Sequence, residues 1–127
     1  MYKYKAKLRR VVDGDTVDVT IDLGFSIYYD CRIRLKGINA PESRTKDLKE
    51  KAKGIAAKER LHELLDGESL IIRTHLDKKG KYGRTLGIIY TPCNPWLSSD
   101  DEVCINQVMV NEGHAVEYKP EGINAKL

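Results

Sequence analysis

Cysteine is scarce in this sequence, and its arrangement argues against two kinds of site. The three cysteines, Cys31, Cys93 and Cys104, contain no C-x-x-C pair. An odd number cannot form a closed set of disulfides. The three histidines show no ligand spacing to the cysteines, so a zinc site is not expected. We therefore expect reduced thiols that pack as small hydrophobic side chains.

Long hydrophobic runs are absent as well. No stretch approaches the ~20 apolar residues of a membrane-spanning helix. The first charged residues are not followed by the apolar run of a secretory signal, and residues 2–5 already alternate as in a strand. Hydrophobic residues make up 41% and charged residues 32% of the 127 residues, as in a globular protein. We expect a single domain over residues 1–127, cytoplasmic localisation and no membrane partner.

The excess of positive charge is small. The 22 basic and 19 acidic residues give a net charge of 22 − 19 = +3. This balance permits a nucleic-acid or phosphate partner without requiring one.

Three segments in the first third of the chain alternate with the period of a strand. Residues 2–12 place Tyr2, Tyr4, Ala6 and Leu8 on one face, residues 16–23 turn Val17 through Leu23 inward at every second position, and residues 29–37 do the same with Cys31, Ile33 and Leu35. Arg34 is then directed away from the core by a rigid element.

A helix is expected over residues 46–65, with Ala57, Leu61, Leu64 and Leu65 on one apolar stripe and Gly67 as a left-handed residue at its end. Strands are expected over residues 69–75 and 85–90, and a short helix over 106–112.

This order of elements favours a five-stranded Greek-key barrel of the oligonucleotide/oligosaccharide-binding (OB) type. The main helix would lie between the third and fourth strands, and the short helix would follow the fifth. An open α+β sheet is the alternative, and the pattern alone does not separate the two.

Three short segments carry the residue types of a phosphate-processing site. Asp13 and Asp15 flank a glycine at the entry to a strand, where a simple hairpin turn is the plainer explanation. Arg34 precedes Glu42 by eight residues, and Pro41 stiffens the approach to that carboxylate.

The third segment is Lys81-Tyr82-Gly83-Arg84, at the entry to the fifth strand. Its two cations and its aromatic ring are suited to binding a phosphate and stacking on a base. Taken alone, this segment is equally typical of a charged hairpin tip.

Taken together and in this order, the three segments resemble the signatures of the staphylococcal nuclease (thermonuclease) family. The resemblance runs from about Val11 to Ala115 and includes the short helix around Ile105-Asn106. It implies an OB barrel, in agreement with the strand pattern. It also implies an enzyme that hydrolyses phosphodiesters in DNA and RNA, typically with Ca²⁺.

The resemblance assigns catalytic roles to three charged residues. Glu42 matches the general base, and Arg34 and Arg84 match two arginines that clamp the phosphate. A planar guanidinium can make two parallel hydrogen bonds to phosphate oxygens, which lysine cannot.

The resemblance also implies a metal site and a substrate site. Asp15 matches a direct metal ligand, the backbone carbonyl of Ala40 matches another, and Asp13 would reach the metal through water. The substrate-binding positions are Lys81, Tyr82 and Tyr118.

Asn39 departs from the family pattern, because it stands where a second metal-binding aspartate is usual. Its amide oxygen can still bind Ca²⁺, but the site loses one negative charge. We therefore expect one Ca²⁺ ion, bound more weakly than by two carboxylates.

Two functions of different classes follow from this sequence. The first is a Ca²⁺-dependent endonuclease for DNA and RNA with little sequence specificity, active as a monomer without an obligate protein partner. Single strands would be preferred, since a flexible strand enters a pocket more easily. The alternative is a nucleic-acid-binding OB module that has lost efficient catalysis, which the substitution at Asn39 keeps open.

Overall fold

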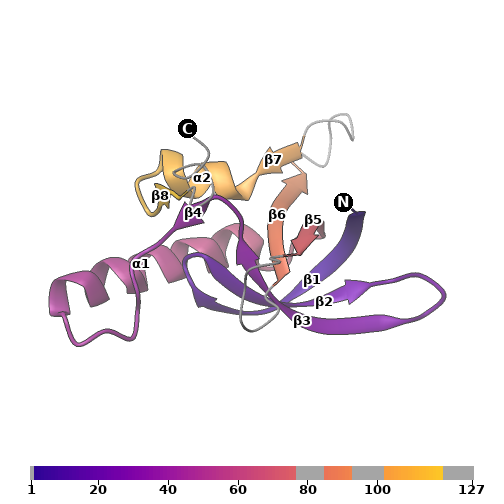
Figure 1. Ribbon diagram of the computed structural model, residues 1–127, viewed down its shortest axis with the longest axis horizontal. Coiled ribbons are helices and arrows are strands. Elements are labelled where there is room, and N and C mark those ends of the chain that lie inside the picture. Colours follow the sequence, from indigo (N-terminus) through magenta and orange to yellow (C-terminus); the bar gives the residue numbers. More distant parts are fainter. Residues whose placement is uncertain (1, 77–84, 93–101, 119–127) are drawn as a thin grey trace.

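The computed structural model describes residues 2–76, 85–92 and 102–118 (Figure 1). In chain order the elements are β1 (Tyr2–Asp13), β2 (Thr16–Asp22), β3 (Tyr28–Leu35), β4 (Ile38–Asn39), α1 (Leu48–Leu65), β5 (Leu70–Leu76), β6 (Thr85–Pro92), β7 (Glu102–Cys104), α2 (Ile105–Asn111) and β8 (Val116–Glu117).

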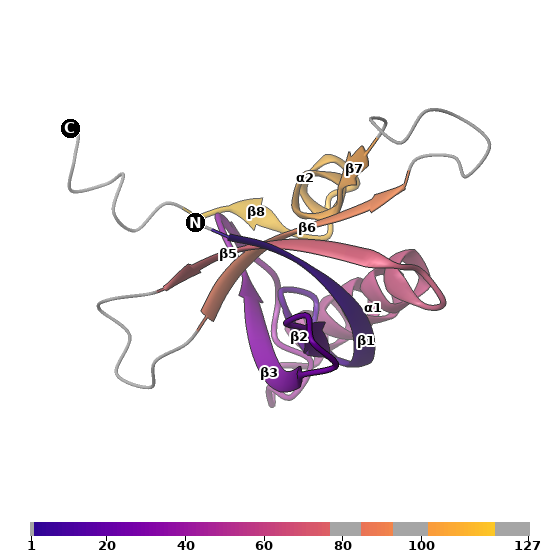
Figure 2. The same cartoon turned by 90° about the vertical axis from the view of Figure 1, so that its right-hand side faces the viewer.

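Five of these strands close a barrel, which confirms the predicted OB-type architecture and excludes the open sheet. The ring runs β1, β2, β3, β6, β5 and back to β1. Its pairings are antiparallel except that of β3 with β6, where Ile33 lies opposite Thr85 and Leu35 opposite Gly87 in parallel register. Figure 2 shows β1 curving through the barrel wall between its two partners.

The pairing of β1 with β2 is irregular near the end of β1. The register with β2 shifts between Leu8 and Arg10, and again between Val11 and Asp13. Such bulges bend a strand and redirect its side chains. As a result Val11 and Val12 are both buried, although they are adjacent in sequence.

Two side chains predicted to face inward are exposed. Tyr2 is 69% exposed, because β2 ends at Asp22, opposite Lys5, and leaves the start of β1 with β5 as its strand neighbour. Leu23 is 45% exposed, because it follows the end of β2 and belongs to the hairpin turn.

Helix α1 lies against the barrel (Figure 1). In the predicted apolar stripe Ala57, Leu61 and Leu65 are buried, and Leu64 is partly buried against the core. The helix begins two residues later than predicted, because the side chain of Asp47 caps it by accepting hydrogen bonds from the backbone N–H groups of Lys49 (3.0 Å) and Glu50 (3.4 Å). Gly67, just beyond its end, has a φ of +74°, as expected. The largest fully buried side chains are Ile33, Leu35, Leu61, Leu65, Leu70, Ile72, Ile89, Ile105, Met109, Val17 and Val19.

Helix α2 begins one residue earlier than predicted and is fixed to α1 and to the barrel. Arg60 on α1 makes two hydrogen bonds, of 2.6 and 2.9 Å, to the carboxylate of Glu112. The buried amide of Asn106 accepts from the N–H of Ile89 and donates to the carbonyls of Lys36 and Gly87. These contacts hold the segment after α2 in place.

Three short strands and two thiols complete the described structure. The strands β4, β7 and β8 were not predicted, and β4 pairs with β8 beside α2. Cys31 and Cys104 are free thiols, as expected, and burial raises the pKa of the Cys31 thiol. Cys93 lies outside the described residues. No described helix has the length and apolar character that crossing a membrane requires.

Candidate active site

Residues from the end of β1, the turn that follows it and the end of β3 meet at one end of the barrel. Asp13 ends β1, Asp15 lies in the turn, and Arg34 is the last residue but one of β3. Thr16 lies opposite Arg34, and the N–H of Leu35 donates to the carbonyl of Asp15 at 2.8 Å. Sheet pairing therefore brings the turn beside Arg34.

The carboxylate of Asp15 is held in a fixed position. Asp15 is only 7% exposed. One carboxylate oxygen accepts from the hydroxyl of Thr16 at 2.9 Å, and the other accepts from the backbone N–H of Ala40, also at 2.9 Å. Each oxygen keeps a further lone pair, so Asp15 can still accept a hydrogen bond or bind a cation.

The guanidinium of Arg34 joins Asp15 to Asn39. Its Nη2 atom lies 3.5 Å from a carboxylate oxygen of Asp15 and 3.3 Å from the amide oxygen of Asn39. Its Nη1 atom donates to the carbonyl of Leu35 at 3.0 Å. With a side chain only 15% exposed, Arg34 is positioned before any ligand binds.

Glycine is required between the two aspartates for reasons of packing. A Cβ on Gly14 would lie 2.7 Å from the Cβ of Ala57 on α1 and 3.0 Å from that of Ala40. The turn thus packs directly against the helix and against the segment that follows β4. The sequence indicated a hairpin turn here, but not this close approach.

Asp13 fastens the loop that carries Glu42. One of its carboxylate oxygens accepts hydrogen bonds from the hydroxyl (2.6 Å) and the backbone N–H (3.3 Å) of Ser43. Ser43 is 7% exposed, and sequence reasoning missed it, although it directly follows Glu42. Asp13 therefore has a positioning role that is visible without a metal.

Gly54 on α1 supports the same loop from the other side. A Cβ at this position would overlap the carbonyl group of Glu42 and would lie 2.7 Å from the nitrogen of Ser43. The helix and the loop backbone are thus in direct contact. In the sequence, the only sign of this contact is an isolated glycine inside a helical pattern, and the sequence analysis did not predict the contact from it.

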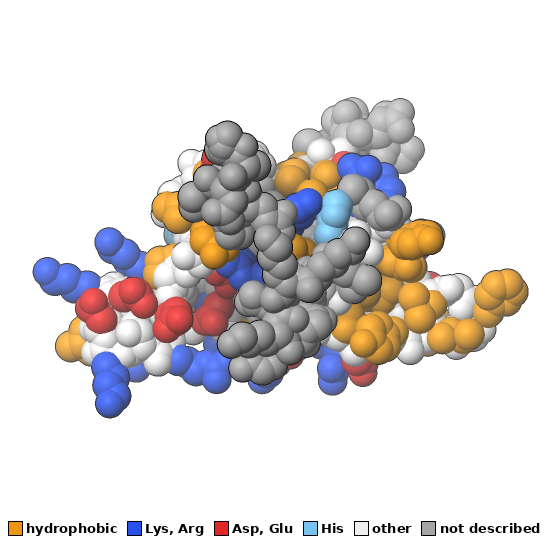
Figure 3. Space-filling model, in the orientation of Figure 1, with side chains coloured by type: hydrophobic (Ala, Val, Ile, Leu, Met, Phe, Trp, Pro, Cys, Tyr) orange, Lys and Arg blue, Asp and Glu red, His pale blue; other side chains and the backbone are white. Residues whose placement is uncertain are grey.

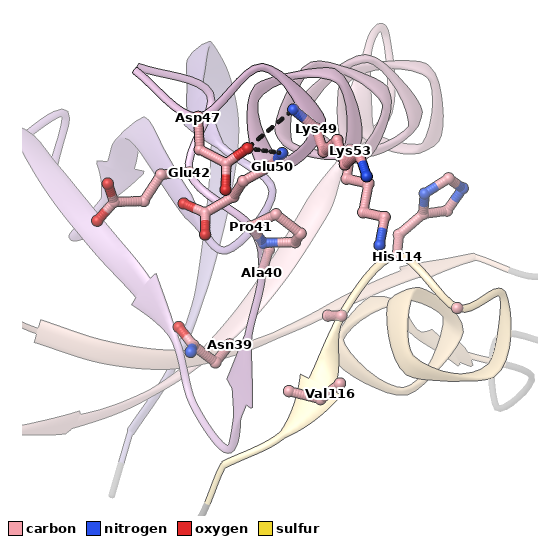
Figure 4. Close-up of a pocket in the computed structure, with 12 residues that line it drawn as sticks. Asn39, Ala40, Pro41, Glu42, Asp47, Lys49, Glu50, Lys53, His114 and Val116 are labelled. Carbon is pink, nitrogen blue, oxygen red and sulfur yellow. Dashed lines mark hydrogen bonds between the residues drawn. The ribbon is translucent and has the colours of Figure 1, made fainter. Parts of the chain in front are cut away.

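Glu42 lies on the rim of a surface cavity of about 730 Å³ (Figure 4). Its side chain is exposed, and no other described residue hydrogen-bonds or pairs with its carboxylate. The cavity is lined by residues 39–42, the N-terminal cap and first turns of α1, and the connection from α2 to β8. Besides Glu42, its charged or titratable side chains are Asp47, Lys49, Glu50, Lys53 and His114. A free carboxylate at the mouth of such a cavity can accept a proton from water.

Not every predicted site residue can be placed. Lys81, Tyr82 and Arg84 lie outside the described residues. Tyr118 follows β8 and is 45% exposed, and its backbone N–H donates to the carbonyl of Gly37 at 2.7 Å. This hydrogen bond places Tyr118 next to the segment that leads to Asn39.

The oxygen atoms of Asp15, Asn39 and Ala40 are of the kind that bind hard cations. The carboxylate oxygen of Asp15 and the amide oxygen of Asn39 lie near one nitrogen of Arg34, and Asp15 also contacts the backbone of Ala40. These residues suit a divalent ion that takes its remaining ligands from water or substrate. In the part of the chain that the structure describes, no three His, Cys, Asp or Glu side chains form a metal-binding group.

Fold and site together define an OB barrel that gathers a carboxylate, an amide and a guanidinium beside a cavity. The profile of the family described as staphylococcal nuclease homologue matches residues 32–126. The chain belongs to this family, as the motifs predicted.

Two relatives are similar to this chain over nearly its whole length. The chain is 32% identical over 120 residues to a micrococcal nuclease of Shigella flexneri, covering 94% of this chain and 61% of that protein. It is 31% identical over 122 residues to the protein ParB of Escherichia coli, covering 93% of this chain and 59% of that protein. The chain thus spans about three fifths of the length of these curated relatives.

Proposed function

We propose that this protein is a Ca²⁺-dependent endonuclease that hydrolyses phosphodiester bonds in DNA and RNA with little sequence specificity. The observation that carries the proposal is the position of Arg34, with one nitrogen within 3.5 Å of oxygens from both Asp15 and Asn39. Glu42 follows Asn39 by three residues, and both line the same cavity. Membership of a nuclease family supports the same reaction class.

Phosphodiester hydrolysis needs an activated water and positive charge around the phosphorus. In the proposed reaction Glu42 removes a proton from water, whose oxygen bonds to phosphorus while the ester P–O bond breaks. The electron pair of that bond stays with the leaving oxygen, which takes up a proton from solvent to become a hydroxyl group. The guanidinium of Arg34 binds the phosphate oxygens as they gain charge. Arg84 would also bind the phosphate oxygens.

Asp15, Asn39 and the carbonyl of Ala40 would hold the Ca²⁺ ion. Bound there, the ion supplies positive charge to the phosphate group. Lys81, Tyr82 and Tyr118 would bind the substrate. The proposed protein is a monomer that works in the cytoplasm.

The test is an incubation with labelled single-stranded DNA, RNA and the matching DNA duplex, in Ca²⁺ or in chelator. We expect cleavage of all three in Ca²⁺, fastest for single strands, and none in chelator. Equal cleavage in chelator would rule out the metal, and faster cleavage of intact duplex would contradict the strand preference. Binding without cleavage in any divalent ion would favour the alternative, a nucleic-acid-binding module. The amide at Asn39 is the feature that favours this alternative.

Replacing Asn39 by aspartate is expected to tighten Ca²⁺ binding. The change adds a second carboxylate next to Asp15, and Ca²⁺ affinity rises with the charge of its ligands. Arg34 Nη2 contacts the present amide oxygen at 3.3 Å. In the metal-free variant the new carboxylate would therefore already have the positive charge of Arg34 beside it. Calorimetric titration of both proteins checks the expectation, and equal affinities would contradict it.

A further inference from the structure

The hairpin between β2 and β3 exposes an unusual amount of hydrophobic surface. It projects from the barrel, and hydrophobic side chains gather over it in the space-filling view (Figures 1 and 3). The large exposed hydrophobic side chains of this hairpin are Leu23 (45% exposed), Phe25 (98%), Ile27 (55%), Tyr28 (65%) and Tyr29 (57%). So many large exposed hydrophobic side chains on one hairpin are typical of a site of interaction.

The tip of the hairpin has a backbone conformation that is unfavourable for its aromatic residue. Gly24, Phe25 and Ser26 have φ angles of +83°, +54° and +62°. A bulky residue at positive φ is strained, and such strain persists where the surrounding structure enforces it. Here the N–H of Leu23 donates to the carbonyl of Ile27 at 2.9 Å. The turn therefore presents Phe25 to solvent in a defined position.

The two tyrosines of the hairpin lie on opposite faces of the sheet. Side chains alternate along a strand, so Tyr28 shares the outer face of β3 with Arg34, whereas Tyr29 shares the inner face with Ile33. Tyr28 lies opposite Asp22 of β2, which lies opposite Lys5 of β1. At ~3.3 Å per residue, the six steps along the strand from Tyr28 to Arg34 span about 20 Å.

The outer face of β1, β2 and β3 has more cations than anions. Three acids on this face are already engaged: Asp18 pairs with Arg32 (2.8 Å) and Arg10 (2.9 Å), Asp30 pairs with Arg9 (3.7 Å), and Asp22 accepts from the N–H of Gly24 (2.8 Å). Hydrogen bonds from Arg32 and Arg10 lower the pKa of Asp18 to about 2, so these pairs persist at neutral pH.

Three lysines remain on β1 with no ion-pair partner among the described residues. Lys3, Lys5 and Lys7 are exposed and alternate with inward-facing side chains, so they form a row on the outer face. Such a row is complementary to the phosphates of a polynucleotide. Aromatic rings beside a basic track are the combination that binds single-stranded nucleic acid, since bases stack on the rings.

We propose that this outer face is a second binding surface for single-stranded nucleic acid, in which bases stack on Tyr28 and Phe25 and phosphates contact the β1 lysines. The inference rests on the proposed function, because the bound strand would be the substrate that continues to Arg34. The surface would extend the substrate site by about 20 Å, the span from Tyr28 to Arg34. It would therefore select long strands over short ones.

The experiment compares Tyr28→Ala with Tyr29→Ala, a matched pair of adjacent and similarly exposed tyrosines on opposite faces. Binding of a labelled oligothymidylate of about 15 nucleotides is measured by fluorescence anisotropy in chelator. We expect Tyr28→Ala to weaken binding at least about fivefold and Tyr29→Ala to leave it unchanged. Lys5→Gln with Lys7→Gln should lower the salt dependence of log K by about 1.4, for two lost phosphate contacts.

Cleavage gives a second measurement. Tyr28→Ala should raise KM for the long strand without changing kcat, and it should not affect a dinucleotide, which cannot reach from Arg34 to the hairpin. Equal affinities of the two tyrosine variants, or loss of binding in Tyr29→Ala alone, would overturn the proposal. A dimer in light scattering that Tyr29→Ala dissociates would assign the hairpin to a second copy instead.

These outcomes separate the surface from the nuclease activity. If the wild-type protein binds the oligonucleotide through Tyr28 but cleaves nothing, the proposed function fails and the surface stands. If the wild-type protein cleaves and the Tyr28 variant is unaltered in every measurement, the surface fails and the proposed function stands.

Discussion

Replacing Glu42 by glutamine is expected to lower kcat for single-stranded DNA by a factor on the order of 10²–10⁴, the usual contribution of a general base. Glutamine has nearly the same shape, but its amide cannot accept the proton from water. Because no described residue hydrogen-bonds or pairs with this carboxylate, the substitution removes no such interaction among the described residues. Affinity for the oligonucleotide should therefore remain within a factor of about two.

The matched control is Glu68→Gln, which removes an exposed carboxylate just beyond the end of α1. Helix α1 has 18 residues and is about 27 Å long, and Glu42 contacts its first half, so Glu68 is remote from the cavity. Initial rates in Ca²⁺ and anisotropy in chelator are measured for both variants. Full activity of Glu42→Gln would remove this carboxylate from the proposed mechanism, and equal losses in both variants would indicate a general effect of charge.

The barrel could be predicted because its strands alternate strongly. Val17, Val19 and Ile21 on β2 are all buried, as the period of two requires. The pattern could not specify the parallel contact between β3 and β6, which joins residues about 50 positions apart and is set by closure of the sheet. It also missed β4, β7 and β8, because strands of two or three residues are too short to show a period.

The motifs indicated which distant residues lie close together, but they could not indicate contacts that backbone packing decides. The resemblance placed Asp15, Arg34 and Asn39 in one site, and the structure brings them into contact. The contacts of Ser43 and Gly54 were missed, since a hydrogen bond to Asp13 and a close helix approach leave no periodic trace. The catalytic, metal-binding and substrate-binding roles assigned to all these residues stay predictions, and Arg84, Lys81 and Tyr82 also lie outside the described residues.

Replacing Gly54 by alanine is expected to damage both stability and activity, although alanine is the better helix former. Alanine in a helix interior is favoured over glycine by about 1 kcal/mol. Here, however, the added Cβ would overlap the carbonyl of Glu42 and lie 2.7 Å from the nitrogen of Ser43. The backbone of Glu42 and Ser43 can avoid the added Cβ only if the whole loop segment moves. Overpacking of this kind lowers the free energy of unfolding by about 1–3 kcal/mol. We therefore expect a lower Tm. Because a displacement of a catalytic group by about 1 Å can reduce the rate 10²-fold, we also expect kcat to fall by ~10–100-fold.

Ala52→Gly on the same helix is the control, because Ala52 is exposed and the change alters helix propensity by the same amount in the opposite direction. It should lower Tm without lowering kcat. A double-mutant cycle then identifies the route of the effect. If Gly54→Ala acts by displacing Glu42, it should lower kcat far less in the Glu42→Gln background, where the carboxylate is already lost. Additive losses in the cycle, or a Gly54→Ala protein that is more stable and fully active, would show that the helix does not position this loop.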